Sequence, residues 1–170
     1  KSIETLPSPQ AYLNRGYIKD EMKDYYGAIK DYTLSIQAAE DSDEIQAEGY
    51  YNRALSYESI KNYKEALKDY DYAISLNATN PDYYAQRAIL RAKHGFLQEA
   101  LTDIEKSIQL EPEFEGFKQI RNEIKKLVQQ SEQEIKQTVN VASQGESKVT
   151  TSATKTTNFI ASADENMKNG

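Results

Sequence analysis

Three pairs of arginine and aspartate are the most regular chemical feature of this sequence. In each pair the aspartate follows the arginine by 16 residues: Arg15 and Asp31, Arg53 and Asp69, Arg87 and Asp103. A guanidinium can donate two parallel hydrogen bonds to one carboxylate. We therefore predict a partly buried structural ion pair between two antiparallel helices in each case, with separate solvated charges as the alternative.

The remaining reactive side chains form no pattern typical of catalysis or metal binding. The sequence has no cysteine and one histidine, His94, with no triad partner or second metal ligand near it. Acidic pairs such as Asp20 and Glu21 lack the spacing of a calcium loop. We expect no enzyme activity, no metal and no cofactor.

Composition narrows the classes of partner. The net charge is −6, and a nucleic-acid surface would need clustered lysine and arginine to replace phosphate counterions. No apolar run reaches the roughly 18 residues of a membrane span. We expect a soluble protein with no nucleic-acid partner, and the cytoplasm is slightly favoured, although the absence of cysteine does not fix the compartment.

The elements that must position these side chains come from an internal repeat. Residues 9–42, 47–80 and 81–114 align without gaps as three copies of 34 residues, so each residue has a repeat position counted from the start of its copy. Position 8 is small, position 20 is alanine and position 24 is large and apolar. In copy order these residues are Gly16, Ala54 and Ala88; Ala28, Ala66 and Ala100; and Tyr32, Tyr70 and Ile104. Alternation of large and small residues at helical spacing favours close packing of antiparallel helices.

This pattern resembles the tetratricopeptide repeat (TPR) family, whose repeat is a helix–turn–helix hairpin of 34 residues. The resemblance implies an all-α solenoid. We expect helices at about 9–22, 25–39, 44–60, 63–76, 81–93 and 97–110, with side-chain caps from Ser8, Asp24, Asn62 and Asn80. A capping helix at 113–137 should cover the last repeat through Phe117, Ile120, Ile124 and Leu127.

The predicted organisation has three parts. Residues 1–8 are an N-terminal extension, residues 9–138 are the TPR domain, and residues 139–170 are a polar tail or linker rich in serine and threonine. As a variant, this tail could itself occupy a groove through Lys148, Lys155 and the pair Phe159 and Ile160, because tethering raises the effective concentration of a weak motif.

The resemblance also implies that the first helix of each repeat contributes side chains to a concave, partner-binding groove. The residues at the corresponding positions are Leu13, Asn14, Tyr17 and Glu21 in copy one, Glu48, Tyr51, Asn52, Leu55 and Glu58 in copy two, and Asp82, Gln86, Ile89 and Lys93 in copy three. Position 9 is apolar in every copy (Tyr17, Leu55, Ile89). These three side chains either contact a bound segment or pack between adjacent first helices.

Some TPR proteins hold the C-terminal carboxylate of a heat-shock chaperone with a clamp of lysine, asparagine and arginine. Of the clamp residues this sequence keeps Asn52, while Leu13, Tyr17, Asp82 and Gln86 occupy the other positions. The expected partner is instead a protein or peptide segment, neutral to basic and with apolar anchors. We interpret the chain as an interaction scaffold or adaptor. The alternative is a structural subunit that assembles a complex or homo-oligomer, such as a homodimer, through the capping helix.

Overall fold

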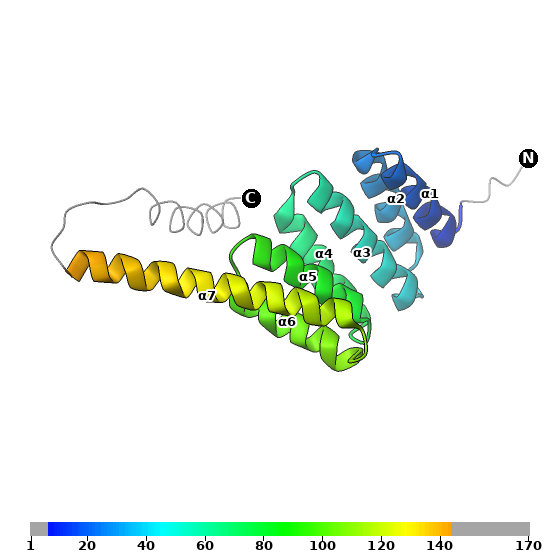
Figure 1. Cartoon of the computed structure of the whole chain (residues 1–170). Coiled ribbons are helices and arrows are strands. Elements are labelled where there is room, and N and C mark those ends of the chain that lie inside the picture. Colours follow the sequence, from blue (N-terminus) through cyan, green and yellow to red (C-terminus); the bar gives the residue numbers. More distant parts are fainter. Residues whose placement is uncertain (1–6, 144–170) are drawn as a thin grey trace, which may run out of the picture. The chain divides into compact units, whose positions relative to one another are not determined.

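The computed structural model describes residues 7–143, and this part of the chain folds into helices without strands (Figure 1). Residues 1–6 and 144–170, which hold most of the predicted extension and tail, lie outside the described residues. The helices, in chain order, are α1 (Pro9–Glu21), α2 (Tyr25–Ala38), α3 (Asp43–Ser59), α4 (Tyr63–Leu76), α5 (Pro81–Lys93), α6 (Leu97–Leu110) and α7 (Glu115–Ser143). The ends of α1 to α6 lie within one residue of the predicted ends, whereas α7 begins two residues later and ends six residues later than predicted.

Side chains at three of the four predicted caps start helices α1, α2 and α5. Ser8 Oγ accepts a hydrogen bond from the Ala11 amide at 3.2 Å, and Asp24 Oδ1 accepts one from the Gly27 amide at 3.0 Å. Asn80 Oδ1 accepts from the Asp82 amide at 2.9 Å. Each bond satisfies an amide that has no partner within its own helix.

The predicted side-chain cap at Asn62 is wrong, because its side chain makes no capping hydrogen bond. Backbone geometry sets this helix start instead. Lys61, the residue before it, has φ 61°, and the equivalent turn residues Lys23 and Gly95 have φ 62° and 84°. All three occupy repeat position 15, where a left-handed residue lets the next amide bond back to the end of the first helix, as the Asn62 amide does to the Tyr57 carbonyl at 2.8 Å.

The chain forms two compact units, which divide between Tyr84 and Ala85. In the first unit α1 packs on α2, α2 on α3 and α3 on α4. The small residue at position 8 allows this contact: a Cβ atom added to Gly16 would lie 2.6 Å from the Tyr32 ring. Ala54, at the same repeat position, is fully buried. These small residues are therefore part of the interior, as the repeat pattern predicts.

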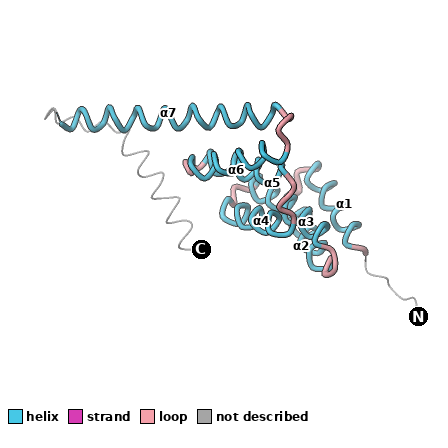
Figure 2. The backbone as a smooth tube through the Cα atoms, turned by 90° about the horizontal axis from the view of Figure 1, so that it is seen from below, coloured by secondary structure: helices cyan, strands magenta, loops and turns pink. Residues whose placement is uncertain are grey.

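The second unit has a core of aliphatic and aromatic side chains from α5, α6 and α7. Its buried members are Ala85, Ala88, Ala100, Ile104, Phe117 and Ile124, with Ile120 packed against them. The first turns of α7 lie beside α6, and the helix then continues past the end of α6 (Figures 1 and 2). Leu127, the fourth residue of the predicted apolar stripe, is 42% exposed. Further along α7, Ile135 and Val139 are each 62% exposed.

Candidate functional site

The three arginine–aspartate pairs join the two helices of each repeat. Arg15 donates from Nε and Nη2 to the two carboxylate oxygens of Asp31, both at 2.6 Å. The same bidentate geometry holds Arg53 to Asp69 at 2.7 and 2.8 Å, and Arg87 to Asp103 at 2.9 and 2.7 Å. The three aspartate side chains are at most 4% exposed. Each carboxylate is therefore removed from water and held by its arginine.

Sequence reasoning missed a second base in two of these sites. Lys19 Nζ lies 2.8 Å from Asp31, and Arg91 Nη1 lies 2.6 Å from Asp103. Both bases occupy repeat position 11, one helical turn after the predicted arginine and on the same helix face. Position 11 of copy two is Tyr57, and the Arg53 guanidinium instead lies over the Tyr57 and Tyr50 rings at 5.9 and 5.3 Å.

The second base has an electrostatic consequence. Hydrogen bonds from Arg15 and then Lys19 lower the pKa of Asp31 below its ordinary value. Around Asp69, which has one base, burial is the larger effect and raises the pKa of this carboxyl, although Arg53 opposes the change. Copies one and two thus share the geometry of the ion pair, but the pKa of the aspartate is lowered in copy one and raised in copy two.

These pairs also determine the charge that remains on the surface of α1 and α3. The bases of these two helices are Arg15, Lys19 and Arg53, and all three are ion-paired with a carboxylate of the following helix. The acids of α1 are Asp20 and Glu21, and those of α3 are Asp43, Glu44, Glu48 and Glu58. The face between α1 and α3 therefore has acidic side chains without compensating bases of these helices.

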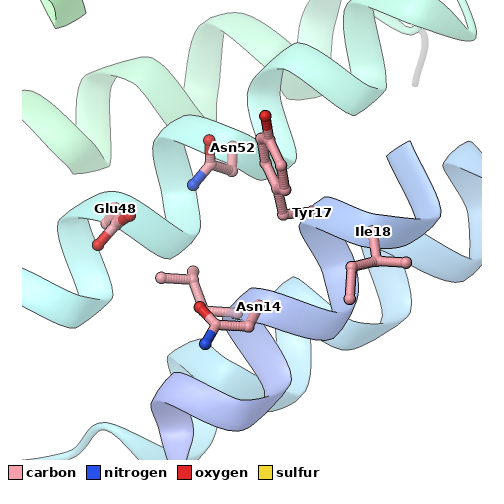
Figure 3. Close-up of a pocket in the computed structure, with 6 residues that line it drawn as sticks. Asn14, Tyr17, Ile18, Glu48 and Asn52 are labelled. Atoms are coloured by element: carbon pink, nitrogen blue, oxygen red, sulfur yellow. The ribbon is translucent and has the colours of Figure 1, made fainter. Parts of the chain in front are cut away.

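Two open depressions lie on this face, with volumes of about 240 and 200 Å³. The first depression is lined by Leu13, Asn14, Tyr17, Ile18, Glu48 and Asn52. Figure 3 shows that Asn14, Tyr17 and Ile18 come from α1 and Glu48 and Asn52 from α3, with the Tyr17 ring reaching towards Asn52. Tyr17 is 59% exposed and Ile18 is 57% exposed, so apolar surface is accessible here beside two amide side chains.

The second depression adjoins the first, because Tyr17 and Asn52 line both. Its lining is Tyr17, Asp20, Glu21, Tyr25 and Tyr32 from the first repeat and Asn52, Leu55 and Ser59 from α3. Its charged members are the two acids, and three tyrosines surround them. The two depressions thus differ in their lining: the first has Leu13 and Ile18 beside one acid, Glu48, and the second has two acids and three tyrosines.

Asp20 is fixed in position by two hydroxyl groups. Tyr32 Oη donates to Asp20 Oδ2 at 2.7 Å, and Ser56 Oγ on α3 donates to the same carboxylate at 2.8 Å. Desolvation raises the pKa of Asp20, and the two hydrogen bonds oppose this effect. Burial, and then the hydrogen bond to Asp20, raise the pKa of the Tyr32 hydroxyl far above its ordinary value. The carboxylate joins α1, α2 and α3 while it lines the second depression.

Other predicted groove residues have structural contacts. Tyr51 packs against the Tyr83 and Tyr70 rings, with centroids 4.9 and 6.0 Å away, and lines neither depression. Glu58 accepts a hydrogen bond from Tyr70 Oη at 2.5 Å. Glu48 lines the first depression, where desolvation and the neighbouring Glu44 charge raise its pKa.

The third-copy residues lie on α5, where Asp82 and Lys93 are exposed and Gln86 and Ile89 are partly buried. Asp82 belongs to the first unit and the other three to the second. The structure thus brings together Leu13, Asn14, Tyr17, Glu21, Glu48, Asn52 and Leu55 around the two depressions. Ile18, Tyr25 and Tyr32 also line them, and sequence reasoning did not assign these three residues to the groove.

Residues 7–143 contain no group of three or more acidic or histidine side chains placed to hold a metal ion. Over the same range, no helix combines the length and apolar character needed to cross a bilayer.

Comparison with known proteins places this arrangement in a family. Residues 9–42 and 47–80 each match a sequence profile of the tetratricopeptide repeat. These segments coincide with the first two copies of the internal repeat. The chain belongs to the tetratricopeptide repeat family, and its described part has the all-α helical-repeat fold of that family.

Several solved structures are similar to the chain. The second TPR of Spaghetti (RPAP3), bound to the HSP90 peptide SRMEEVD, is 34% identical, with a TM-score of 0.56 over 61% of this chain and 93% of that chain. The second TPR domain of human RPAP3, in complex with the HSP70 peptide SGPTIEEVD, is 31% identical, with a TM-score of 0.61 over 69% and 98%. The Sgt2 TPR domain from Aspergillus fumigatus is 18% identical, with a TM-score of 0.66 over 78% of this chain and 87% of that chain. At this identity the similarity is evidence for a shared fold only. A comparison with curated protein sequences gives no match.

Proposed function

We propose that the chain is a protein-interaction scaffold that binds an extended segment of a partner protein on the face between α1 and α3. The observation that carries this proposal is the pair of adjoining depressions, which share Tyr17 and Asn52. Tyr17 is 59% exposed although it lines both depressions. A side chain at position 9 can contact a bound segment or pack between adjacent first helices. In copy one, the exposure of Tyr17 favours contact with a bound segment.

The lining chemistry suits peptide binding. The amides of Asn14 and Asn52 can each donate to a backbone carbonyl and accept from a backbone amide, so they can hold a main chain without selecting its side chains. Tyrosine and isoleucine surfaces beside them can bury an apolar side chain, at roughly 25 cal/mol for each Å² removed from water. Together these groups resemble a binding site with apolar walls and a small number of polar contacts.

The negative charge of the two depressions disfavours acidic peptides as ligands. The RPAP3 domains described above bind peptides that end in the residues EEVD. In this chain Asn52 is the one residue that matches the chaperone-binding clamp. The charged residues that line the depressions are all acids: Glu48 in the first, and Asp20 and Glu21 in the second. A carboxylate-rich ligand would meet like charges there, so we propose a neutral to basic partner segment.

A displayed library of random peptides, screened against the full chain, tests this function. Selected peptides should lose at least about tenfold in affinity when Tyr17→Ala and Asn52→Ala are combined, because both depressions lose a wall. The matched control is Tyr26→Ala, since Tyr26 is 75% exposed and lines neither depression. If the selected peptides bound the double variant as well as the control, the proposal would be wrong.

A second candidate function rests on α7. Leu127, Ile135 and Val139 leave apolar surface exposed along this helix beyond the core of the second unit. Such a surface could join two copies of the chain or dock the chain onto a larger complex. Sedimentation velocity over a range of concentrations should then show a dimer that Ile135→Glu dissociates. A monomer at all concentrations would remove the homodimer. Ile124→Glu is unsuitable for this test, because Ile124 is 2% exposed and belongs to the core.

A further inference from the structure

The two depressions are offset along the groove by a distance that matches an extended peptide. On α1 the first depression contacts residues 13–18 and the second contacts residues 17–21, and on α3 the corresponding residues are 48–52 and 52–59. The centres of these contacts differ by about four to five residues, which is roughly 6–8 Å at 1.5 Å per helical residue. An extended chain advances about 6.6 Å over two residues. Side chains at positions i and i+2 of one peptide also point to the same face, so both can enter the groove.

The second depression fits a basic side chain. Asp20 is held by two hydroxyl donors, and a carboxylate has about four acceptor positions, so capacity remains for a ligand. Glu21 beside it is exposed and adds a second negative charge. The rings of Tyr17 and Tyr25 line the same depression, and aromatic faces attract cations. A planar guanidinium can stack on a tyrosine and bond to a carboxylate at the same time, which a lysine ammonium cannot do equally well.

The first depression fits an apolar side chain. Its exposed apolar side chains are Tyr17 and Ile18, each more than half exposed, and the buried Leu13 also lines it. Its charged residue, Glu48, lies on the α3 side. An aliphatic side chain can cover Tyr17 and Ile18 without a charged partner of its own.

We propose that this groove recognises two residues of an extended partner segment, an aliphatic side chain in the first depression and an arginine two residues away in the second. This inference rests on the proposed function and specifies its ligand. The order of the two residues follows the direction in which the peptide runs. Recognition through alternate side chains gives specificity, while Asn14 and Asn52 contact the backbone between them.

Short capped peptides of alanine and serine that carry one leucine and one arginine test the inference. Dissociation constants come from chemical-shift titration of the ¹⁵N-labelled full chain. In at least one order, the peptide with one residue between leucine and arginine should bind at least about fivefold more tightly than peptides with zero or three intervening residues. Citrulline in place of arginine should weaken this peptide about tenfold, because citrulline keeps the shape and removes the charge. The acidic peptide SRMEEVD should bind more weakly than the leucine–arginine peptide.

A double-mutant cycle assigns the arginine to the second depression. In Glu21→Gln the penalty for citrulline should shrink to about threefold or less, whereas Glu40→Gln should leave the full penalty, because Glu40 is exposed and lines neither depression. Ile18→Ser should in the same way reduce the penalty for replacing the peptide leucine with alanine.

The outcomes separate the two proposals. If the peptides bind but arginine and citrulline are equivalent, or affinity is the same at every spacing, this inference is overturned while the groove remains a binding surface. If neither the leucine–arginine peptides nor library peptides bind, the proposed function fails as well.

Discussion

The two units of the chain use different chemistry at the same pair of repeat positions. In the first unit the acid at position 12 accepts a hydrogen bond from the tyrosine at position 24, as Asp20 does from Tyr32 and Glu58 from Tyr70. In the second unit the same positions are Ala92 and Ile104, which belong to one apolar cluster. The first unit therefore joins its helices here through a polar contact, and the second through aliphatic packing.

This difference shows how core and surface chemistry are linked in a helical repeat. In the first unit, each acid at position 12 accepts a hydrogen bond that joins the two helices of its repeat, and Asp20 also lines the second depression. Where alanine and isoleucine replace the pair, no carboxylate is left at that position. The acidic character of the first-unit groove is therefore partly a consequence of a buried tyrosine that needs an acceptor for its hydroxyl.

The largest expected effect concerns the ion pairs, a feature that both units share. Asp69→Ala should lower the free energy of unfolding by about 3 kcal/mol, and Asp103→Ala by a similar or larger amount, because largely buried guanidinium groups lose their counter-charge. Urea unfolding followed by circular dichroism measures both. Asp41→Ala, an exposed control, should stay within about 0.5 kcal/mol. If Asp69→Ala were as mild as the control, the ion pair would have no structural role.

The second-largest expected effect concerns the hydrogen bonds between tyrosine and acid, which distinguish the first unit from the second. Tyr70→Phe should cost about 1.5 kcal/mol, because the variant keeps the buried ring and loses the hydrogen bond to Glu58. Tyr32→Phe should cost a similar amount through Asp20. Tyr26→Phe is the matched control, since that tyrosine is 75% exposed, and should be close to neutral. Neutral results at both buried tyrosines would show that ring packing alone, as in the second unit, holds these helices.

Much of this fold could be predicted from the sequence, because the repeat states the same constraints three times. Small residues at position 8 and alanine at position 20 predicted that the two helices of each repeat pack closely, and the spacing of Arg53 and Asp69 predicted their contact. The end of α7 was harder to predict, because glutamine and glutamate after Val128 are good helix formers but give no apolar pattern.

The details of the candidate site were less predictable. The second base at position 11 could have been found, since Lys19 and Arg91 recur one turn after the arginines. The hydrogen bond from Ser56 to Asp20 could not, because it joins two repeats and leaves no periodic signal. The inward packing of Tyr51 against Tyr83 was hidden for the same reason.

A smaller effect is electrostatic and lies within the first repeat. Asp31 should titrate below the ordinary aspartate pKa because of Arg15 and Lys19, and Asp20 above it because of desolvation. Side-chain carboxyl NMR over pH 2–7 measures both directly. The lowered pKa of Asp31 means that its stabilising contribution is complete above its unfolded pKa, about 3.9, and is lost as the pH falls through the lowered folded value.

The titration has a matched stability test. Asp31→Asn should reduce the loss of stability on acidification, because this variant has no carboxylate to protonate at that position. Titration of Asp20 and Asp31 in the reverse order would contradict the assigned contacts.

Mapping a bound peptide onto the chain tests the central claim most directly. Amide chemical shifts of the full chain, followed during titration with a leucine–arginine peptide, should change most at residues 13–21 of α1 and 48–59 of α3. In α2, shifts should be confined to the neighbourhood of Tyr25 and Tyr32, which line the second depression. Shifts in α4 and the exposed part of α7 should stay small. Changes concentrated on α7, or spread evenly over the helices, would contradict a binding groove between α1 and α3.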